Sequence, residues 1–398
     1  MARAASHRSD IEMFHVMDVL AAAAARREQG LEVVSLAAGQ PSTPAPAPVL
    51  AAVRAALDAD PLGYTESLGT SALREAIAGH HRRLHGIDVS ASDVVVTTGS
   101  SGAFTLIFLA AFDIGDQVAM ARPGYPAYRN TLAALGCEVI ELDCGPATRY
   151  APTPAMLDAL DSPPAGLIVA SPANPTGTVL APDELAALAR WCDAHGTLLI
   201  SDEIYHGIEY GIEYGSAGDD SPIPATSSAW STSRESVVVG SVSKYFSMTG
   251  WRLGWMLVPA RYRRAVERLT ANMTICPPAI AQAGALAAFG PESIAECNSH
   301  VRRYATNRRL LLDGLAGLGV TDIAPPDGAF YLYADIAHLT DDSLTWCRDV
   351  LAETGVAVTP GVDFDSVAGG HTVRMSFAGS TAEVDRALDL LQPVLRRS

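Results

Sequence analysis

Residues 237–244 read Val-Val-Val-Gly-Ser-Val-Ser-Lys. Three consecutive valines favour a β-strand that is buried on both faces, and the small polar residues after them favour a turn at its carboxyl end. The same order, a short apolar run followed by a polar loop, recurs along the chain, with helical patterns between the runs. Strands that are apolar throughout are typical of a mostly parallel sheet covered by helices, so an α/β fold is predicted.

Further apolar runs match this pattern and are predicted as strands at residues 94–96, 117–121, 166–170, 198–200 and 253–258. Helices are predicted between them, for instance at 103–112 and at 182–195, where Gly196 stands in the position favoured for a left-handed C-cap. Ligands of an open parallel sheet bind beyond the carboxyl ends of its strands. The polar loops after these runs are therefore the predicted place of a functional site.

The pattern changes from about Glu292 onward. Helical patterns at 301–318 and 343–354 accompany the run Phe-Tyr-Leu-Tyr at 330–333 and strand patterns at 356–358 and 373–377, which predicts a smaller α+β domain. The predicted organisation is an N-terminal segment (1–44) packed beside the small domain, a large domain (45–290) and a small C-terminal domain (291–398).

Composition excludes several classes of partner. The formal charge is −16, from 28 basic and 44 acidic residues, so neither nucleic acid nor an anionic membrane is an expected partner. No apolar run approaches the roughly 20 residues of a membrane span, and the N-terminus lacks a secretory pattern, which predicts a cytoplasmic protein. The six cysteines form no CxxC pair or zinc-spaced Cys/His cluster, so reduced thiols and no metal site are expected.

Two of the polar loops are ambiguous when taken alone. The Gly-Ser-Ser segment at 99–101 would let backbone N–H groups and a helix dipole approach a phosphate, but such turns without a ligand are at least as common. Asp202 would place a carboxylate on the floor of the crevice, and Tyr205 would point to the same side if the chain turns helically there. A helix N-cap is the alternative interpretation of the Ser-Asp-Glu string at 201–203.

The segment 240–244 invites two other interpretations. A P-loop needs two glycines flanking four residues before Lys-Ser/Thr, and this segment lacks them. Ser241 and Lys244 match the SxxK motif of serine acylases, which also need SDN and KTG elements. The nearest strings are SDE at 201–203 and MTG at 248–250, and each differs at the decisive position. The acylase interpretation is therefore rejected.

The string SVSKYFSMTGWRLGW at 241–255 resembles the cofactor-lysine signature of class I aminotransferases, which belong to fold type I of the pyridoxal 5′-phosphate (PLP) enzymes. Other blocks resemble the same family in the same order: AAGQP (37–41), GYTESLGTSALREAIA (63–78), TTGSSGAF (97–104), RPGYPAY (122–128), SPANPTG (171–177), SDEIY (201–205), PDGAFYLY (326–333) and VRMSFA (373–378). This resemblance spans nearly the whole chain. It implies a seven-stranded-type sheet in a large domain, a smaller α+β domain, and PLP as the cofactor.

The resemblance also implies a role for each matching residue. Lys244 would hold PLP as an aldimine and later shuttle the proton between substrate and cofactor. Asp202 would pair with the protonated pyridine nitrogen and keep the ring an electron sink. Tyr205 and Asn174 would hydrogen-bond the phenolic oxygen of the ring, and Tyr125 would stack on its face.

Other matching positions would hold the phosphate and the substrate. The implied phosphate ligands are Gly99, Ser100, Ser101, Ser241 and Arg252. Tyr64 would reach the phosphate of the neighbouring subunit, which implies a homodimer with shared active sites. Arg374 would bind the substrate's α-carboxylate through two parallel N–H bonds, assisted by Gly39 and Asn174.

The implied function is an aminotransferase of amino acid metabolism that moves an amino group from an amino acid to a 2-oxo acid by a ping-pong aldimine mechanism. PLP-dependent lyases, oxidases and cyclases share the scaffold and are the alternative. A PLP-binding transcription regulator is rejected, because the catalytic frame begins near Leu31 and leaves no room for a helix-turn-helix domain.

The side chain of the substrate is left open by these motifs. Dicarboxylate-specific relatives often use a second arginine, and the remaining candidates form a helical cluster expected to face solvent: Arg261, Arg263, Arg264 and Arg268. The expected pocket-lining residues are His15, Met17, Tyr64 and Ile275. A neutral, apolar or aromatic amino acid is the predicted substrate.

Overall fold

The computed structural model describes residues 5–59, 61–210 and 226–396. A seven-stranded sheet with the order β2-β8-β7-β6-β5-β3-β4 forms its centre. The strands are β2 (Val94–Thr97), β3 (Gln117–Arg122), β4 (Glu138–Asp143), β5 (Gly166–Ala170), β6 (Leu198–Asp202), β7 (Val237–Ser241) and β8 (Gly254–Leu257). All neighbours are parallel except β8, which runs antiparallel to β2 and β7. The predicted α/β fold with a mostly parallel sheet is confirmed.

Helices cover both faces of this sheet, which explains why its strands are apolar throughout. In β2, Val94 and Val96 enter one hydrophobic cluster, while Val95 enters another. The first cluster includes residues of α3 (Ser71–His85) and α7 (Pro182–His195), and the second includes residues of α4 (Gly99–Ala111) and α5 (Pro126–Leu135). Each fully buried valine side chain contributes on the order of 1.5–3 kcal/mol to this packing.

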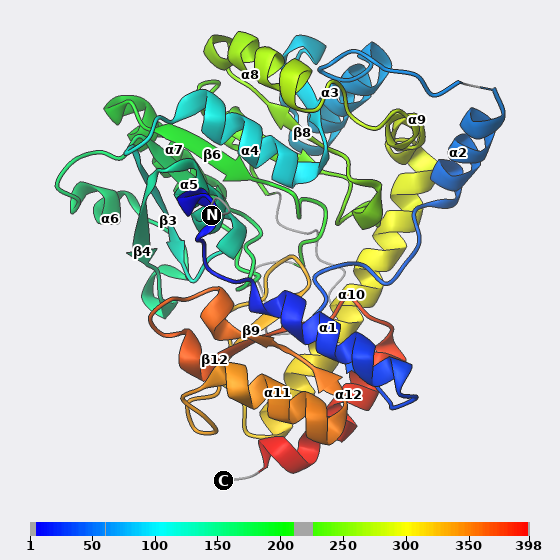
Figure 1. Cartoon of the computed structure of the whole chain (residues 1–398), viewed down its shortest axis with the longest axis vertical. Coiled ribbons are helices and arrows are strands. Elements are labelled where there is room, and N and C mark those ends of the chain that lie inside the picture. Colours follow the sequence, from blue (N-terminus) through cyan, green and yellow to red (C-terminus); the bar gives the residue numbers. More distant parts are fainter. Residues whose placement is uncertain (1–4, 60, 211–225, 397–398) are drawn as a thin grey trace, which may run out of the picture.

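The remaining helices are α1 (His15–Glu28), α2 (Ala47–Ala59), α6 (Pro154–Asp158), α8 (Ala260–Met273), α9 (Ala279–Ala288), α10 (Pro291–Gly317), α11 (Ser343–Thr354) and α12 (Thr381–Leu395), as Figure 1 shows. The helix predicted at 182–195 is observed, and Gly196 caps it with a φ of 71°. The helix α4 begins four residues before its predicted start at 103. Its first turn is Gly-Ser-Ser-Gly, which contains no apolar residue that a periodic pattern could detect.

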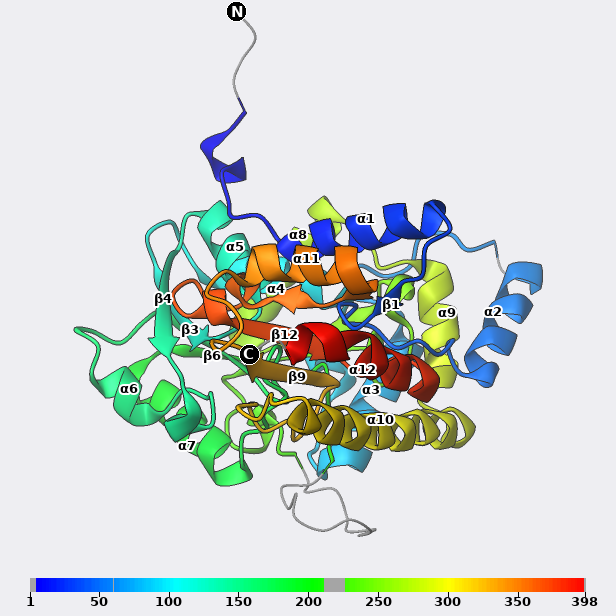
Figure 2. The ribbon, with the colours of Figure 1, turned by 90° about the horizontal axis from the view of Figure 1, so that it is seen from below.

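A second layer is built from the C-terminal part of the chain. The strands β11 (Thr359–Pro360), β12 (Thr372–Ser376) and β9 (Tyr331–Asp335) form an antiparallel sheet, flanked by α10, α11 and α12. The N-terminal segment joins this layer, because β1 (Val34–Ser35) pairs in parallel with β10 (Val356–Ala357). Figures 1 and 2 show α1 lying beside α11. The strand predicted at 356–358 is observed as β10 over 356–357, and a second short strand, β11, follows at 359–360 with a different partner.

The helix α10 connects the two layers. It begins at Pro291, ten residues before the predicted start at 301, with proline in the first helical turn where its missing N–H costs nothing. One end packs on α2 and α9, and the other end packs on α12. Among the described residues, no helix combines the length and apolar character that crossing a bilayer requires.

Candidate active site

A cavity of about 270 Å³ lies at the carboxyl ends of the parallel strands, between the sheet and the C-terminal layer. Asp202, the last residue of β6, and Lys244, shortly after β7, enter it from the sheet. Tyr331 of β9 and Arg374 of β12 enter it from the C-terminal layer. The chain therefore brings together residues that are far apart in sequence at the place where an open parallel sheet binds its ligands.

Most of the predicted site residues line this cavity: Gly39, Ser100, Ser101, Tyr125, Asn174, Asp202, Tyr205, Lys244, Arg252 and Arg374. Gly99, Ser241 and Tyr64 are not among the lining residues. Gly99 and Ser241 lie directly behind it, as described below, whereas Tyr64 is 84% exposed on the surface of the chain.

Lys244 is the only lysine of the chain. Its Nζ donates a hydrogen bond of 2.6 Å to the backbone carbonyl of Gly39 and lies 5.7 Å from the centre of the Tyr205 ring. Burial lowers the pKa of Lys244 to about 8; the positive charges of Arg374 and Arg252 also lower it, while Asp202 raises it. This amine is therefore much more readily deprotonated than an exposed lysine, as a nucleophile must be.

Asp202 is a buried carboxylate at the floor of the cavity. It accepts hydrogen bonds from the Tyr128 hydroxyl and, at 3.2 Å, from the backbone N–H of Ile204. Burial raises the pKa of Asp202 to about 6, although the hydrogen bonds from Tyr128 and Ile204 and the charge of Lys244 oppose the shift. Such a carboxylate has a strong need for a cationic partner.

Tyr331 was not among the predicted site residues. Its hydroxyl is hydrogen-bonded to the Tyr205 hydroxyl at 2.7 Å, and its ring centre lies 4.5 Å from Cζ of Arg374. A Cβ atom at Gly39 would lie 2.5 Å from the Tyr331 hydroxyl. The only signal for Tyr331 in the sequence was its place in the block at 326–333.

Arg374 is buried, with 3% of its surface exposed. Nη1 donates to Oδ1 of Asn174 at 2.9 Å, and Nη2 donates to the carbonyl of Ala37 at 2.9 Å and to Oγ1 of Thr359 at 3.2 Å. None of the ion pairs between described residues includes this guanidinium. A buried cation whose hydrogen-bond partners are all neutral is costly, so Arg374 is suited to bind a carboxylate from outside the chain.

The first turn of α4 forms an anion cradle with Arg252. Gly99 has a φ of 72°, and a Cβ there would lie 2.5 Å from Nη2 of Arg252, so only glycine fits. Ser100 and Ser101 follow at the helix N-terminus, where N–H groups and the helix dipole favour an anion. Thr249 holds Arg252 by accepting a 3.0 Å hydrogen bond from Nη1 at its carbonyl.

Ser241 supports this cradle from behind. Its hydroxyl interacts with Oγ of Ser243 at 2.8 Å and with the carbonyl of Leu253 at 3.2 Å. Ser243, whose own N–H donates to Oγ of Ser241 at 3.0 Å, is the residue of this pair that lines the cavity.

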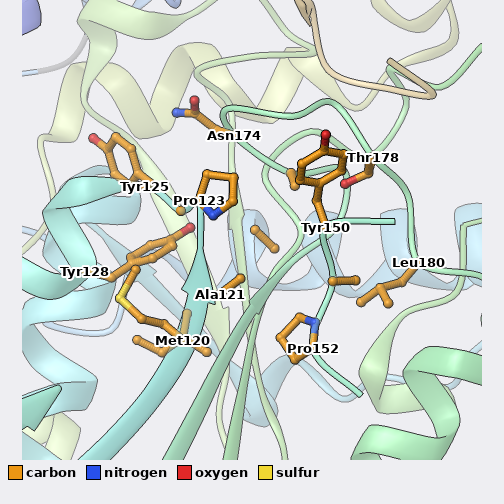
Figure 3. Close-up of a pocket in the computed structure, with 15 residues that line it drawn as sticks. Met120, Ala121, Pro123, Tyr125, Tyr128, Tyr150, Pro152, Asn174, Thr178 and Leu180 are labelled. Carbon is orange, nitrogen blue, oxygen red and sulfur yellow. The ribbon is translucent and has the colours of Figure 1, made fainter. Parts of the chain in front are cut away.

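A smaller pocket adjoins the main cavity on the side of β3 and β5 (Figure 3). The two spaces share Tyr125, Tyr128, Ala170 and Asn174, and Figure 3 labels the two tyrosines and the asparagine. The Tyr125 ring packs edge-to-face on Tyr128 at 5.2 Å and on Phe14 at 6.1 Å between ring centres. Tyr125 is thus fixed between α5 and the N-terminal segment.

The N-terminal segment forms an apolar wall of the cavity. Phe14, Val16 and Leu20 line it, in place of the predicted His15 and Met17, of which Met17 is 58% exposed. The helical period of α1 turns Val16 and Leu20 inward and leaves Met17 on the outer face. Asp363 fixes this helix by accepting 2.8 Å hydrogen bonds from the backbone N–H groups of residues 15 and 16.

Comparison with known proteins identifies the family. The family model "Aminotransferase class I and II" matches residues 32–391. The chain is 56% identical over 381 residues to the valine–pyruvate aminotransferase of Mycobacterium tuberculosis, covering 96% of each chain. It is 34% identical over 375 residues to the aspartate/prephenate aminotransferase of Thermus thermophilus, covering 94% of this chain and 93% of the relative.

Solved structures agree with these sequence matches. A crystal structure of an aminotransferase from Mycobacterium tuberculosis superposes with a TM-score of 0.95 at 54% identity, over 100% of both chains. The Thermus thermophilus aspartate aminotransferase with maleate superposes with a TM-score of 0.89 at 33% identity, over 99% of this chain and 100% of the other.

The residues present fit the cofactor of this family. A buried amine of lowered pKa suits the PLP aldehyde, a buried carboxylate suits a protonated pyridine nitrogen, and the glycine-dependent anion cradle suits the phosphate. The guanidinium of Arg374, which has no ion-pair partner among the described residues, suits the carboxylate of an amino acid. This chain therefore belongs to the class I and II aminotransferases and is a PLP-dependent enzyme that moves an amino group between an amino acid and a 2-oxo acid.

Proposed function

We propose that the enzyme transfers the amino group of a small apolar amino acid, valine foremost, to pyruvate. The relative from Mycobacterium tuberculosis, 56% identical over 96% of the chain, is named for this pair of substrates. The apolar wall of Phe14, Val16 and Leu20 supports the same choice, because it offers contact surface to an aliphatic side chain and no hydrogen bond to a polar one.

The charge of the cavity is the observation that carries this proposal. Among the described residues, the cations that line it are Lys244, Arg252 and Arg374. The first two serve the cofactor in this proposal, and the third serves the α-carboxylate. A side-chain carboxylate would then be buried without a partner from this chain, which costs several kcal/mol. Aspartate, the substrate named for several more distant relatives, is therefore disfavoured here.

We assign the residues around the cofactor ring as follows. Asp202 would bind the pyridine nitrogen, Tyr205 and Asn174 would bind the phenolic oxygen, and Tyr125 would lie against the ring face. When bound, PLP supplies the electron sink that allows the Cα–H bond of the substrate to break. The Tyr331 hydroxyl, 2.7 Å from that of Tyr205, positions Tyr205 for its role.

Lys244 holds the cofactor and moves the proton in this proposal. When free, the amine at Nζ would take the proton from Cα of the substrate and return it to the cofactor. Its pKa of about 8 places it close to the range in which an amine is both available as a base and able to return the proton.

The phosphate is held by the anion cradle of α4 and Arg252, that is by Gly99, Ser100, Ser101 and Arg252, with Ser241 behind Ser243. We infer that the enzyme is a homodimer in which Tyr64 completes the cradle of the partner subunit. The 84% exposure of Tyr64 supports this inference, because a large aromatic side chain is then available to cross an interface.

Arg374 orients the substrate. Its guanidinium binds the α-carboxylate, with Asn174 holding Nη1 and the backbone of Gly39 closing the other side. A fixed carboxylate turns the Cα–H bond toward Lys244, and the apolar wall excludes water from that space.

The proposed domain limits are 1–44, 45–290 and 291–398, and the start of α10 at Pro291 and the pairing of β1 with β10 support them. We also propose that the enzyme works in the cytoplasm, since all six cysteines carry free thiols, five of them buried.

A half-reaction assay tests the substrate proposal. The visible absorbance of the PLP enzyme is followed after adding one amino acid without an acceptor. Valine and alanine, the product of pyruvate amination, should convert the cofactor rapidly, and aspartate and glutamate should react slower by roughly 100-fold or more. Equal rates for aspartate and valine would refute the proposal.

A specificity variant sharpens this test. Leu20→Arg places a cation in the apolar wall and should raise the rate with aspartate relative to valine. Met17→Arg adds the same charge on the outer face of the same helix and should leave this ratio unchanged. An unchanged ratio in Leu20→Arg would mean that the wall does not face the side chain of the substrate.

A further inference from the structure

A cluster of metal-binding side chains lies outside the active-site cavity. It consists of His85, the last residue of α3, and of Glu203 and His206, which flank the turn that holds Tyr205. One ligand atom from each of the three side chains lies within 4.8 Å of the other two. The side chains of His206 and Glu203 are only 6% and 2% exposed. None of the three lines the active-site cavity.

The hydrogen bonding of His85 defines its tautomer. Nδ1 lies 3.1 Å from the backbone carbonyl of Thr226, and because a carbonyl only accepts, Nδ1 must bear the hydrogen. Burial lowers the pKa of His85 to about 4, partly opposed by this hydrogen bond, so the ring is neutral near pH 7. Nε2 then has a free lone pair, and it lies 3.0 Å from Nδ1 of His206.

The two carboxylate oxygens of Glu203 are in different situations. Oε1 accepts hydrogen bonds from the Ser201 hydroxyl at 3.0 Å, the Ser228 hydroxyl at 3.1 Å and the N–H of Ala229 at 2.9 Å. Oε2 is buried without any hydrogen bond and lies 3.5 Å from Nδ1 of His206. Oε1 therefore accounts for the structural role of this side chain, and Oε2 is left pointing at the two imidazoles.

Nδ1 of His206 faces two polar neighbours, His85 and Glu203, and cannot donate a hydrogen bond to both. With a hydrogen on Nδ1, a neutral His206 ring can donate to Nε2 of His85, and Oε2 of Glu203 has no hydrogen bond. The geometry places Nδ1 of His206 3.0 Å from Nε2 of His85 and 3.5 Å from Oε2 of Glu203.

We propose that Nε2 of His85, Nδ1 of His206 and Oε2 of Glu203 bind a divalent transition metal of the zinc type. Two imidazoles and one carboxylate are donors that Zn²⁺ accepts in tetrahedral geometry. Metal–nitrogen bonds of about 2.0–2.1 Å at a tetrahedral angle place the two nitrogens about 3.3 Å apart. The observed 3.0 Å therefore needs only a small outward movement.

Other features of the cluster agree with a metal site. The Nδ1–H of His85 is held by the Thr226 carbonyl, which is the usual second partner of a metal-binding imidazole. His206 also lines a cavity that His80 and Glu209 border, so an ion and a water molecule as fourth ligand have a route of entry. The metal would tie α3 to the segment between Asp202 and Tyr205, so its effect is on stability and on the position of that segment.

Metal analysis of the full-length holoenzyme, purified without a histidine tag, tests this proposal. The protein is incubated with ZnSO₄, passed over chelating resin and measured by plasma mass spectrometry. About one zinc per chain should remain, and Tm should fall by several degrees after removal of the metal with a chelator. Substitution by Co²⁺ should give the visible bands of a tetrahedral site with nitrogen and oxygen ligands. Less than about a tenth of an equivalent of zinc, with no response of Tm, would overturn the proposal.

Three variants locate the site. His85→Gln and His206→Gln should each lose the retained zinc and the response of Tm to the chelator. His338→Ala removes an exposed histidine elsewhere and should retain both. Zinc retained at the same level in both glutamine variants would overturn the assignment. If these variants do not fold, the zinc content and the Co²⁺ spectrum of the unaltered enzyme decide the question.

Discussion

Lys244 donates its 2.6 Å hydrogen bond to the carbonyl of Gly39, which lies 205 positions earlier in the chain. The same glycine faces the Tyr331 hydroxyl, which would lie 2.5 Å from a Cβ atom at position 39. Tyr331 in turn binds Tyr205 and lies against Arg374. The loop around Gly39, Lys244 and the Tyr331 ring therefore pack against one another. A substitution at one of these positions is expected to displace the other two.

This packing predicts a rescue between two positions. Gly39→Ala should lower kcat/KM, because the new methyl group clashes with the Tyr331 hydroxyl and moves the loop away from Lys244. Tyr331→Phe removes that oxygen and leaves ring atoms no closer than 3.4 Å, so the double variant should recover part of the loss. Steady-state kinetics of the two single variants and the double variant measure the coupling. Purely additive losses would contradict the contact.

The single lysine makes the cofactor attachment simple to test. Borohydride reduction of the holoenzyme should fix PLP on Lys244 alone, as read by peptide mass spectrometry, and Lys244→Ala should yield no such peptide. The rate at which the apoenzyme recombines with PLP should rise with pH around a midpoint of about 8, since only the neutral amine attacks. A midpoint near the usual lysine value would show that burial does not lower this pKa.

Arg374 should be essential for binding amino acids. Arg374→Ala removes two charge-assisted hydrogen bonds to the substrate carboxylate, each worth about 1.5–3 kcal/mol, so kcat/KM should fall by about 100-fold or more. Arg386→Ala is the matched control, because Arg386 forms an exposed ion pair with Glu32 far from the cavity. Unchanged kcat/KM in Arg374→Ala would remove this residue from the site.

Asp202 is expected to lower the free energy of unfolding of the apoenzyme as pH rises. Its pKa is raised from 3.8 to about 6 in the folded chain, so the protonated form stabilises the fold below about pH 4, and this contribution is lost as pH rises through about 6. Asp202→Asn removes the free-energy cost of burying a charged carboxylate. The variant apoenzyme should therefore be more stable than the unaltered one at pH 7–8, by up to about 3 kcal/mol. The same variant should bind PLP more weakly.

Denaturant unfolding of both apoenzymes between about pH 4 and pH 8 measures this effect. Glu203 and Glu209, whose pKa values burial raises to about 8 and about 7, are present in both proteins, so only the difference between the two curves reports Asp202. Parallel curves would mean that the carboxylate is not destabilising in the fold.

The order of apolar runs and polar loops was enough to predict six of the seven strands of the sheet and a site at their carboxyl ends, while the role of each site residue came from the family resemblance. Asp202, Lys244 and Ser100 follow directly from strand ends, and the structure brings them into one cavity. The strand β4 was missed because it lies at the edge of the sheet, where Glu138, Glu141 and Asp143 interrupt the apolar pattern.

Contacts between distant segments could not be predicted in the same way. Tyr128 donates to Asp202 across 74 positions, and Tyr331 meets Tyr205 across 126 positions. Neither tyrosine differs in local pattern from an ordinary buried aromatic residue of a helix or strand. The histidines of the proposed metal site are 121 positions apart, far from the short spacings by which zinc sites are found in sequences.

The parallel pairing of β1 with β10 has a consequence for synthesis on the ribosome. The loop with Ala37 and Gly39 follows β1, and the Ala37 carbonyl accepts its hydrogen bond from Arg374, 337 positions later. During translation this early segment therefore waits for its partners until Val356, Ala357 and Arg374 have emerged. A nascent chain with its central sheet already formed still lacks the arginine that captures amino acids, so catalysis begins only after Arg374 has been added and has reached Ala37.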